Sequence, residues 1–253
     1  MIDARDDKVR RAFQEREDAE LHAVHGRAFH GPAVKIFSTR DAPRSERHLN
    51  GDGMSRCALL RRAVASPFEA TGFCYLPRSA LERLDLHLGR DDEVVSLVAI
   101  RFEGSSGSVD YRAHACREAF APGQGSMIFD PGSEQEIWGQ LLRLRLFERA
   151  ETLWRVGLPP ASAPRAVAAL SPDCFVVDWA GGLLWLESPT GDVHAVAREL
   201  GGHAMLFRAP DEMRRTVPVF APRDEATMAL TRRLKAAFDP AGVFNPGRMY
   251  AGI

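Results

Sequence analysis

The final residues of the chain combine a tight-turn sequence with an amide side chain and a permanent positive charge. From Asp239 to Arg248 the sequence reads D-P-A-G-V-F-N-P-G-R. Proline presets its backbone angle and glycine accepts a left-handed one, so Asn245, Pro246 and Gly247 favour a tight turn. Such a turn can present the Asn245 amide to a flat heterocycle, while Arg248 adds a fixed charge beside it. The alternative is a turn that ends the chain and holds no ligand.

The helix before this turn has the clearest helical pattern in the sequence. It is predicted over 224–238, and it must stop at Asp239 because Pro240 disfavours helical geometry in the residue before it. The end of this helix therefore sets where the turn segment begins.

Upstream of that helix, apolar residues alternate between helical and strand spacing, beginning after Gly53. Further helices are predicted over 54–65, 106–120, 134–147, 163–170 and 190–200. Strands are predicted over 68–76, 94–102, 126–130, 152–158, 174–179, 183–187 and 204–207. The short connections favour an α+β fold with a mostly antiparallel sheet and helices packed on one face. Two copies of a ferredoxin-like split β-α-β unit fit this order of elements.

The first part of the chain differs from the rest in composition. Residues 1–52 are dense in charge, with one possible strand over 33–37 and a polar, turn-rich stretch over 38–52. We therefore expect a charged, peripheral leader over 1–52 and one domain over 53–253.

Composition excludes several classes of function. The 253 residues carry a formal net charge of -1, which gives no field to attract nucleic acid. The four cysteines are scattered, with no spacing typical of a metal site or a disulfide framework. No apolar run reaches the roughly 20 residues that a membrane helix needs, and the N-terminus does not read as a signal peptide. We expect a cytoplasmic protein without metal, docked to a membrane partner.

The closing stretch L-K-A-A-F-D-P-A-G-V-F-N-P-G-R-M-Y, from Leu234 to Tyr250, resembles the C-terminal signature of the FAD-linked oxidases of the vanillyl-alcohol oxidase type. Within that family it is most similar to the FAD-binding subunits of bacterial glycolate oxidases. The resemblance covers about 200 residues, which is too long for a chance motif match. Its other segments, in the expected order, are S-P-F-E-A-T-G at 66–72, G-S-V-D-Y-R at 107–112, L-W-R-V-G-L-P-P at 153–160 and G-G-H-A-M-L-F-R at 201–208.

The resemblance implies a cofactor, a substrate class and partners. The cofactor is FAD, and the flavin ring is contacted by Asn245, Pro246, Gly247 and Arg248. A cation such as Arg248 near the ring stabilises its reduced, anionic form. The implied reaction is hydride transfer from glycolate, or another small 2-hydroxy acid, to FAD. The implied partners are a catalytic flavin subunit and an iron–sulfur subunit, and residues 53–253 would be the cap domain with its flavin-contacting end.

Two residues of the segment 201–208 are weaker site candidates. The related catalytic subunit carries histidine pairs near its substrate and a metal, whereas this segment has the single His203. His203 either touches flavin or substrate, or is an ordinary surface or satisfied imidazole. Arg208 either holds a substrate carboxylate in a bidentate contact or forms a surface ion pair.

The sequence has no glycine-rich loop of the kind that holds a dinucleotide pyrophosphate. Its glycine clusters, such as Gly181-Gly182 and Gly201-Gly202, lack G-x-G-x-x-G spacing. Family members carry that loop in a domain that precedes the matched segments. We therefore expect a truncated subunit that binds FAD weakly or not at all when alone. The alternative function is a non-catalytic remnant, or a partner-binding cap domain, that does not bind FAD by itself.

Overall fold

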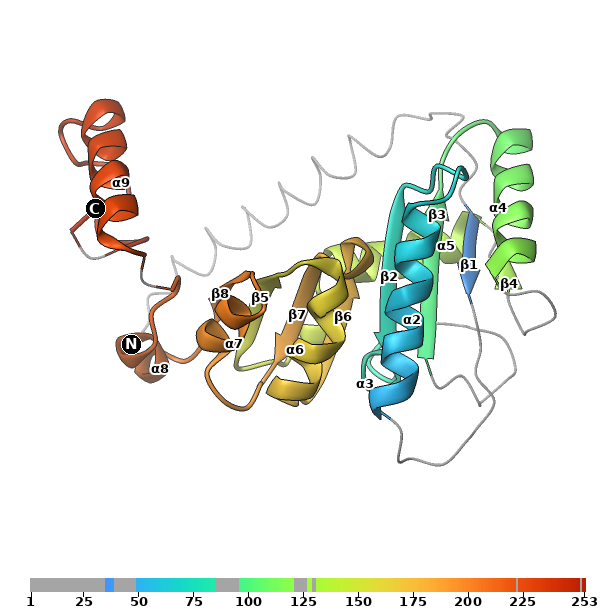
Figure 1. Cartoon of the computed structure of the whole chain (residues 1–253), viewed down its shortest axis with the longest axis horizontal. Coiled ribbons are helices and arrows are strands. Elements are labelled where there is room, and N and C mark those ends of the chain that lie inside the picture. The colour runs from blue at the N-terminus through green and yellow to red at the C-terminus, as the bar shows by residue number, and fades with distance from the viewer. Residues whose placement is uncertain are drawn as a thin grey trace, which may run out of the picture.

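One mixed sheet-and-helix body and a helical C-terminal extension make up the computed structural model (Figure 1). The structure describes residues 35–38, 49–84, 96–120, 127–128, 131–221, 223–250 and 252–253. Its strands are β1 (Lys35–Ser38), β2 (Gly72–Pro77), β3 (Ser96–Phe102), β4 (Met127–Ile128), β5 (Leu153–Gly157), β6 (Cys174–Asp178), β7 (Leu183–Glu187) and β8 (His203–Arg208). Its helices are α2 (Leu49–Val64), α3 (Arg78–Leu81), α4 (Ser106–Phe120), α5 (Pro131–Leu142), α6 (Ala163–Leu170), α7 (Val193–Glu199), α8 (Asp211–Thr216) and α9 (Glu225–Phe238), with short 3-10 turns η1 (Arg145–Phe147), η2 (Pro160–Ser162) and η3 (Trp179–Gly181).

The eight-stranded sheet consists of two ferredoxin-like units that lie edge to edge. The order is β4-β1-β3-β2-β6-β7-β5-β8, and the pairings between these strands are antiparallel. In each group of four the fourth strand lies beside the first, then the third, then the second, as the split β-α-β arrangement requires. The units join where Cys74 and Tyr75 of β2 pair with Asp178 and Val177 of β6. The predicted α+β fold with a mostly antiparallel sheet is confirmed, including its two repeated units.

The expected boundary at residue 52 needs a correction. Strand β1 comes from within the supposed leader, yet it lies between β3 and β4 as the first strand of the first unit. Helix α2 also begins before the boundary, at Leu49. The possible strand over 33–37 was recognised in the sequence, but so short a segment gave no sign that it pairs with β3, far along the chain. The remaining residues of the leader lie outside the described part of the chain.

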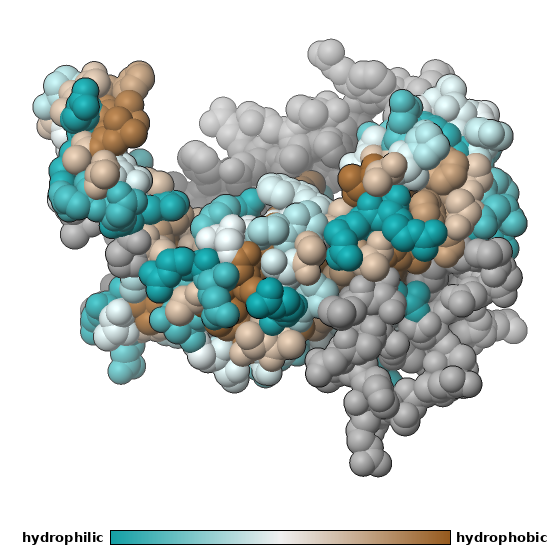
Figure 2. Space-filling view, in the orientation of Figure 1, coloured by the Kyte–Doolittle hydropathy of each residue, from teal (hydrophilic) through white to brown (hydrophobic). Residues whose placement is uncertain are grey.

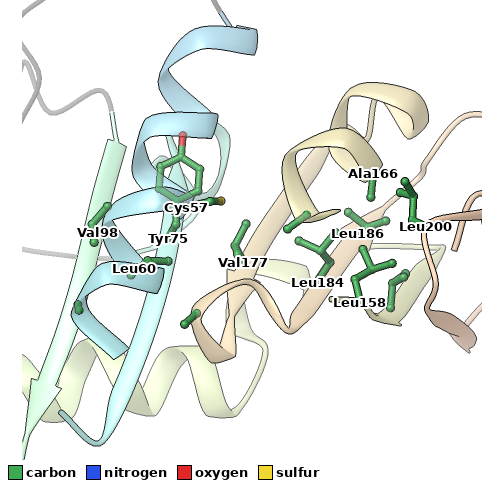
Figure 3. Close-up of a cluster of buried hydrophobic side chains, with 14 of the residues drawn as sticks. Cys57, Leu60, Tyr75, Val98, Leu158, Ala166, Val177, Leu184, Leu186 and Leu200 are labelled. Atoms are coloured by element: carbon green, nitrogen blue, oxygen red, sulfur yellow. The ribbon is translucent and has the colours of Figure 1, made fainter. Parts of the chain in front are cut away.

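Helices α2, α4, α6 and α7 cover one face of the sheet and enclose a hydrophobic cluster that continues across both units. Figure 3 shows Leu60 of α2 beside Tyr75 and Val98 in the first unit, and Leu184 and Leu186 in the second. Burial of each such aliphatic side chain contributes about 1.5–3 kcal/mol. The shared cluster therefore stabilises the two units as one body.

The opposite face carries a second cluster, which the prediction of helices on one face did not include. Ile137 of α5 and Phe147 of η1 are buried there against Leu76 and Leu97 of the first unit. Strand β3 is accordingly buried along nearly its whole length, which explains its continuous apolar sequence. The connection between the two units thus serves as a partial cover for this face.

The C-terminal arm, defined as residues 223–253, stands apart from the sheet (Figure 1). The segment before it is tied to β8, because the Leu206 N–H donates to the Val219 carbonyl at 2.9 Å and Met205 bridges to Phe220. Helix α9 itself has no buried residue. The predicted turn at 245–248 therefore lies on an exposed arm rather than in the core.

Candidate functional site

Helix α9 begins at a well-formed cap. Asp224 accepts a hydrogen bond from the Thr227 backbone N–H at 2.9 Å and another from the Thr227 hydroxyl at 2.7 Å. These hydrogen bonds favour the charged carboxylate and lower the pKa of Asp224. An acidic group also suits the positive end of the helix dipole. The helix is thus fixed at its start by local contacts, without help from the body.

Asp239 organises the chain after the helix. Its side chain is 6% exposed, although the residues that follow it to Met249 are exposed. One oxygen accepts the Val243 N–H at 3.1 Å and the other accepts the Phe244 N–H at 2.9 Å. Lys235, one helical turn earlier, lies 2.6 Å from the carboxylate and donates to the Phe244 carbonyl at 2.5 Å. The contacts from Lys235 and from these N–H groups lower the pKa of Asp239.

The predicted tight turn is present directly after this loop. The Arg248 N–H donates to the Asn245 carbonyl at 3.2 Å, which closes a four-residue turn. Pro246 and Gly247 hold the two central positions, and Gly247 has a φ of +69°. Proline first and a left-handed glycine second is the arrangement of a type II turn. The Gly247 N–H also donates to the Ile253 carbonyl at 2.6 Å, which ties the end of the chain to the turn.

The four residues of the turn are exposed, and exposed apolar residues flank them in the sequence. Figure 2 shows apolar surface gathered on the arm. The exposed large hydrophobic side chains of the arm are Leu230, Leu234, Phe238, Val243, Phe244 and Met249. An amide, a guanidinium and apolar neighbours on one exposed segment suit a flat ring with apolar faces and a polar edge. The chemistry of the residues therefore fits a flavin ring.

The weaker candidates, His203 and Arg208, both lie on β8 of the body. His203 is exposed, and its ring lies so close to Gly157 that a Cβ added there would come within 2.7 Å of it. Arg208 donates to the backbone carbonyls of Phe147 at 2.5 Å and Ala150 at 3.2 Å. Arg208 therefore fastens η1 to β8, which gives it a structural use. In Figure 1 strand β8 and the arm lie apart, so the structure does not bring these two residues to the turn.

A second group of polar and aromatic residues was not singled out from the sequence. The guanidinium of Arg155 lies 5.3 Å from the centre of the Trp179 ring, and this ring is 62% exposed. Trp179 has a left-handed backbone and donates its N–H to Asp178 at 2.7 Å. Burial raises the pKa of Asp178, partly offset by the Trp179 N–H and by Arg155. In the sequence, only the D-W-A-G-G segment at 178–182 indicates this strained corner.

Among the described residues, no side chains stand out as suited to redox chemistry or to metal binding. All four cysteines are buried, and burial raises the pKa of Cys57 to about 11 and of Cys116 to about 12. Groups of three or more metal-ligating side chains are absent from the part of the chain that the structure describes. No helix there is long and apolar enough to cross a membrane.

Comparison with known proteins finds a similarity in the C-terminal part of the chain. Residues 219–249 match the model of the C-terminal domain of FAD linked oxidases. The chain is also 38% identical over 161 residues to glycolate oxidase subunit GlcE of Escherichia coli strain K12. That alignment covers 61% of this chain and 39% of the relative, so the chain spans well under half the length of the protein it matches.

Two solved structures match the chain with low identity and low TM-scores. The isoeugenol complex of 4-ethylphenol oxidase from Gulosibacter chungangensis is 15% identical with a TM-score of 0.44, covering 86% of this chain and 53% of that one. Substrate-bound p-cresol methylhydroxylase is 14% identical with a TM-score of 0.48, covering 87% and 53%. The likeness thus rests on the sequence matches: the chain is similar to glycolate oxidase subunit GlcE over 161 residues, and residues 219–249 match the C-terminal domain of FAD linked oxidases.

Proposed function

We propose that the chain is part of the FAD-binding subunit of a glycolate oxidase-type complex, and that its turn at Asn245, Pro246, Gly247 and Arg248 contacts the flavin ring. The observation that carries this proposal is the exposed type II turn within the segment that matches the FAD-linked oxidases. The Asn245 side chain would meet the polar edge of the ring, and the Arg248 guanidinium would favour negative charge on it. The apolar neighbours Val243 and Met249 would cover its faces.

The reaction and the partners follow from the relationship to GlcE. FAD, when bound, would supply the acceptor for hydride from glycolate or another small 2-hydroxy acid. A catalytic flavin subunit and an iron–sulfur subunit would complete the complex in the cytoplasm, at the inner membrane. His203 remains a weak candidate for the substrate side. Arg208 is weaker still, because it already serves two backbone carbonyls.

The alternative is a partner-binding domain that does not bind FAD by itself. The exposed side chains of Leu230, Leu234 and Phe238 favour it, because Phe238 in particular is 85% exposed. Apolar surface of this kind marks contacts with other proteins as readily as with a ligand.

FAD titration of the 253-residue chain, followed by NMR of the arm amides, distinguishes the two. Two or three hydrogen bonds to the ring would contribute about 1 kcal/mol each to the binding free energy. Association itself costs at least roughly 4 kcal/mol, so the net binding free energy is near zero. We therefore expect shifts at Gly247 and Arg248 with a dissociation constant in the millimolar range or weaker. Arg248→Met should reduce these shifts severalfold, whereas Arg233→Met, an equal charge change on exposed α9, should preserve them.

ADP is the matched control ligand, since it carries the pyrophosphate and adenosine of FAD without the flavin. Equal responses to ADP and FAD, or no response to either, would favour the alternative function. Glycolate-dependent dye reduction in the presence of the flavin and iron–sulfur partners then tests the substrate.

A further inference from the structure

We propose that Asp239 and Lys235 are positioning residues, which hold the turn at 245–248 in a fixed relation to α9. We call this pair the Lys235–Asp239 clamp. The positioning role rests on the proposed function of the turn as a flavin contact. The clamp itself rests on contacts within the arm alone.

Asp239 is buried although the segment that follows it is exposed. Its side chain is 6% exposed, whereas the next residues to Met249 are exposed. A buried carboxylate is costly unless it is paired and hydrogen-bonded. Asp239 meets both conditions, because it accepts two backbone N–H groups and contacts the Lys235 ammonium. The charged side chain in contact with it therefore comes from its own helix.

The clamp joins the end of helix α9 to the two residues that precede the turn. Helix α9 is already ended by backbone hydrogen bonds, from the Asp239 N–H to the Lys235 carbonyl and from the Gly242 N–H to the Asp239 carbonyl. The carboxylate reaches further, to the N–H groups of Val243 and Phe244. These two residues immediately precede Asn245, so the clamp fixes the direction in which the turn leaves the helix. Lys235 adds a second tie at the Phe244 carbonyl.

The clamp also has an electrostatic basis. Two N–H donors and an ammonium stabilise the charged carboxylate, and the pKa of Asp239 is lowered accordingly. The clamp should thus be complete at neutral pH and open only in acid. Asparagine at 239 keeps an oxygen acceptor but loses the charge, and methionine at 235 keeps the stem but loses the ammonium.

The test uses the full chain, with NMR of the Val243 and Phe244 amides. In the native chain both amides should exchange slowly with solvent and should shift together as Asp239 is protonated. Asp239→Asn should abolish this titration and speed exchange by roughly tenfold, as the loss of charge-assisted hydrogen bonds predicts. Lys235→Met should raise the midpoint of the titration. Glu225→Gln, which removes the surface pair with Arg232 on the same helix, should change neither.

The positioning role has its own readout. At equal FAD concentration, Asp239→Asn should weaken the shifts at Arg248 although Arg248 itself is unchanged. Unaltered amide exchange and titration in Asp239→Asn would disprove the clamp. A lost clamp with undiminished FAD shifts would disprove the positioning role. If FAD moves no arm amide in the native chain, the proposed function fails, while the clamp is still decided by exchange and titration. Slow exchange at Leu184 in every variant shows that the body remains folded.

Discussion

Three consecutive residues at the corner between β6 and β7 have left-handed backbones. Trp179 and Ala180 have φ angles of +49° and +54°, and Gly181 has +104°. A left-handed conformation costs a non-glycine residue of order 1–3 kcal/mol and needs local compensation. Asp178 provides part of it by accepting the Trp179 N–H, and Arg155 lies over the Trp179 ring.

Asp178 provides a test of charge against hydrogen bonding at this corner. Burial raises its pKa, so folding makes protonation of Asp178 easier than it is in the unfolded chain. Stability from this group is therefore greatest in acid and falls as the pH rises from the unfolded towards the folded pKa. At pH 7 Asp178→Asn should be at least as stable as the native chain, because it keeps an oxygen for the Trp179 N–H. Asp178→Ala should lose about 1 kcal/mol, as other capping residues do. Urea unfolding measures both, and an asparagine variant clearly less stable than the native chain would show that attraction to Arg155 outweighs burial.

The buried cysteines should react slowly with thiol reagents in the native chain. The thiolate is the reactive form, and burial raises the pKa of Cys57 to about 11 and of Cys174 to about 11. At pH 8 the native chain should therefore react with a thiol reagent far more slowly than the chain in denaturant, where all four thiols should titrate. One fast native thiol would show that a cluster opens locally.

The turn was predictable from the sequence because it depends on local backbone preferences. The roles of side chains that contact residues elsewhere in the chain were not predictable. Pro246 and Gly247 dictate a turn wherever they occur, so its position followed from the residues themselves. The use of Asp239 depends on the loop bringing two N–H groups back to it. Arg208 depends still more on context, because its carbonyl partners belong to residues around η1, far away in sequence. Flavin contact by Asn245 and Arg248 stays a prediction.

At the scale of elements, the strongest periodic segments were located closely. Helix α6 and strand β7 have the predicted bounds of 163–170 and 183–187. The predicted helix over 134–147 instead becomes α5 and η1, because Leu144 between them has a left-handed φ of +52°. Helix α8 had no strong apolar pattern and was not predicted; it has no buried residue. Its Met213 is partly buried against the shared cluster, a contact that the local sequence does not predict.

The glycines differ in how much space a side chain would have, because at some of them two backbone segments approach closely. A Cβ at Gly202 would overlap the carbonyl oxygen of Gly157 and come within 2.6 Å of Leu158, whereas a Cβ at Gly107 of α4 would meet nothing within 4 Å. Gly202→Ala should therefore destabilise the chain by about 1–3 kcal/mol, as overpacking does. Gly107→Ala should stabilise it by roughly 0.5–1 kcal/mol, since alanine is the better helix former. Denaturant midpoints of the two variants should move in opposite directions, and equal shifts would contradict this packing.

At the scale of the whole molecule, the joining of the two units was beyond sequence reasoning. The repeated order of elements indicated two split β-α-β units, but nothing in it specified that β2 would pair with β6. That junction consists of two residue pairs, and Val177 lies there in the cluster that both units share. Such contacts between residues far apart in sequence leave no periodic pattern. The same reason explains why β1 was assigned to a leader.

The body and the C-terminal arm should be energetically separate. Helix α9 buries no residue, and the body holds both hydrophobic clusters. A chain that ends at Ala221 should therefore lose less than about 1 kcal/mol, a shift in melting temperature below roughly 4 °C at this size. Leu184→Ala is the contrasting variant, because this fully buried side chain lies within the shared cluster and its truncation should cost about 2–5 kcal/mol.

Calorimetry and circular dichroism of the shortened chain measure this separation. We expect one cooperative transition, since the cluster enclosed by α2, α4, α6 and α7 continues across both units. The shortened chain should also lose every FAD-dependent change seen in the full chain, because the proposed contacts lie on the arm. A large loss of stability would show that the arm packs on the body in solution. Undiminished FAD binding with intact stability would transfer the ligand site to the body, where His203 and Arg155 would become the residues to test.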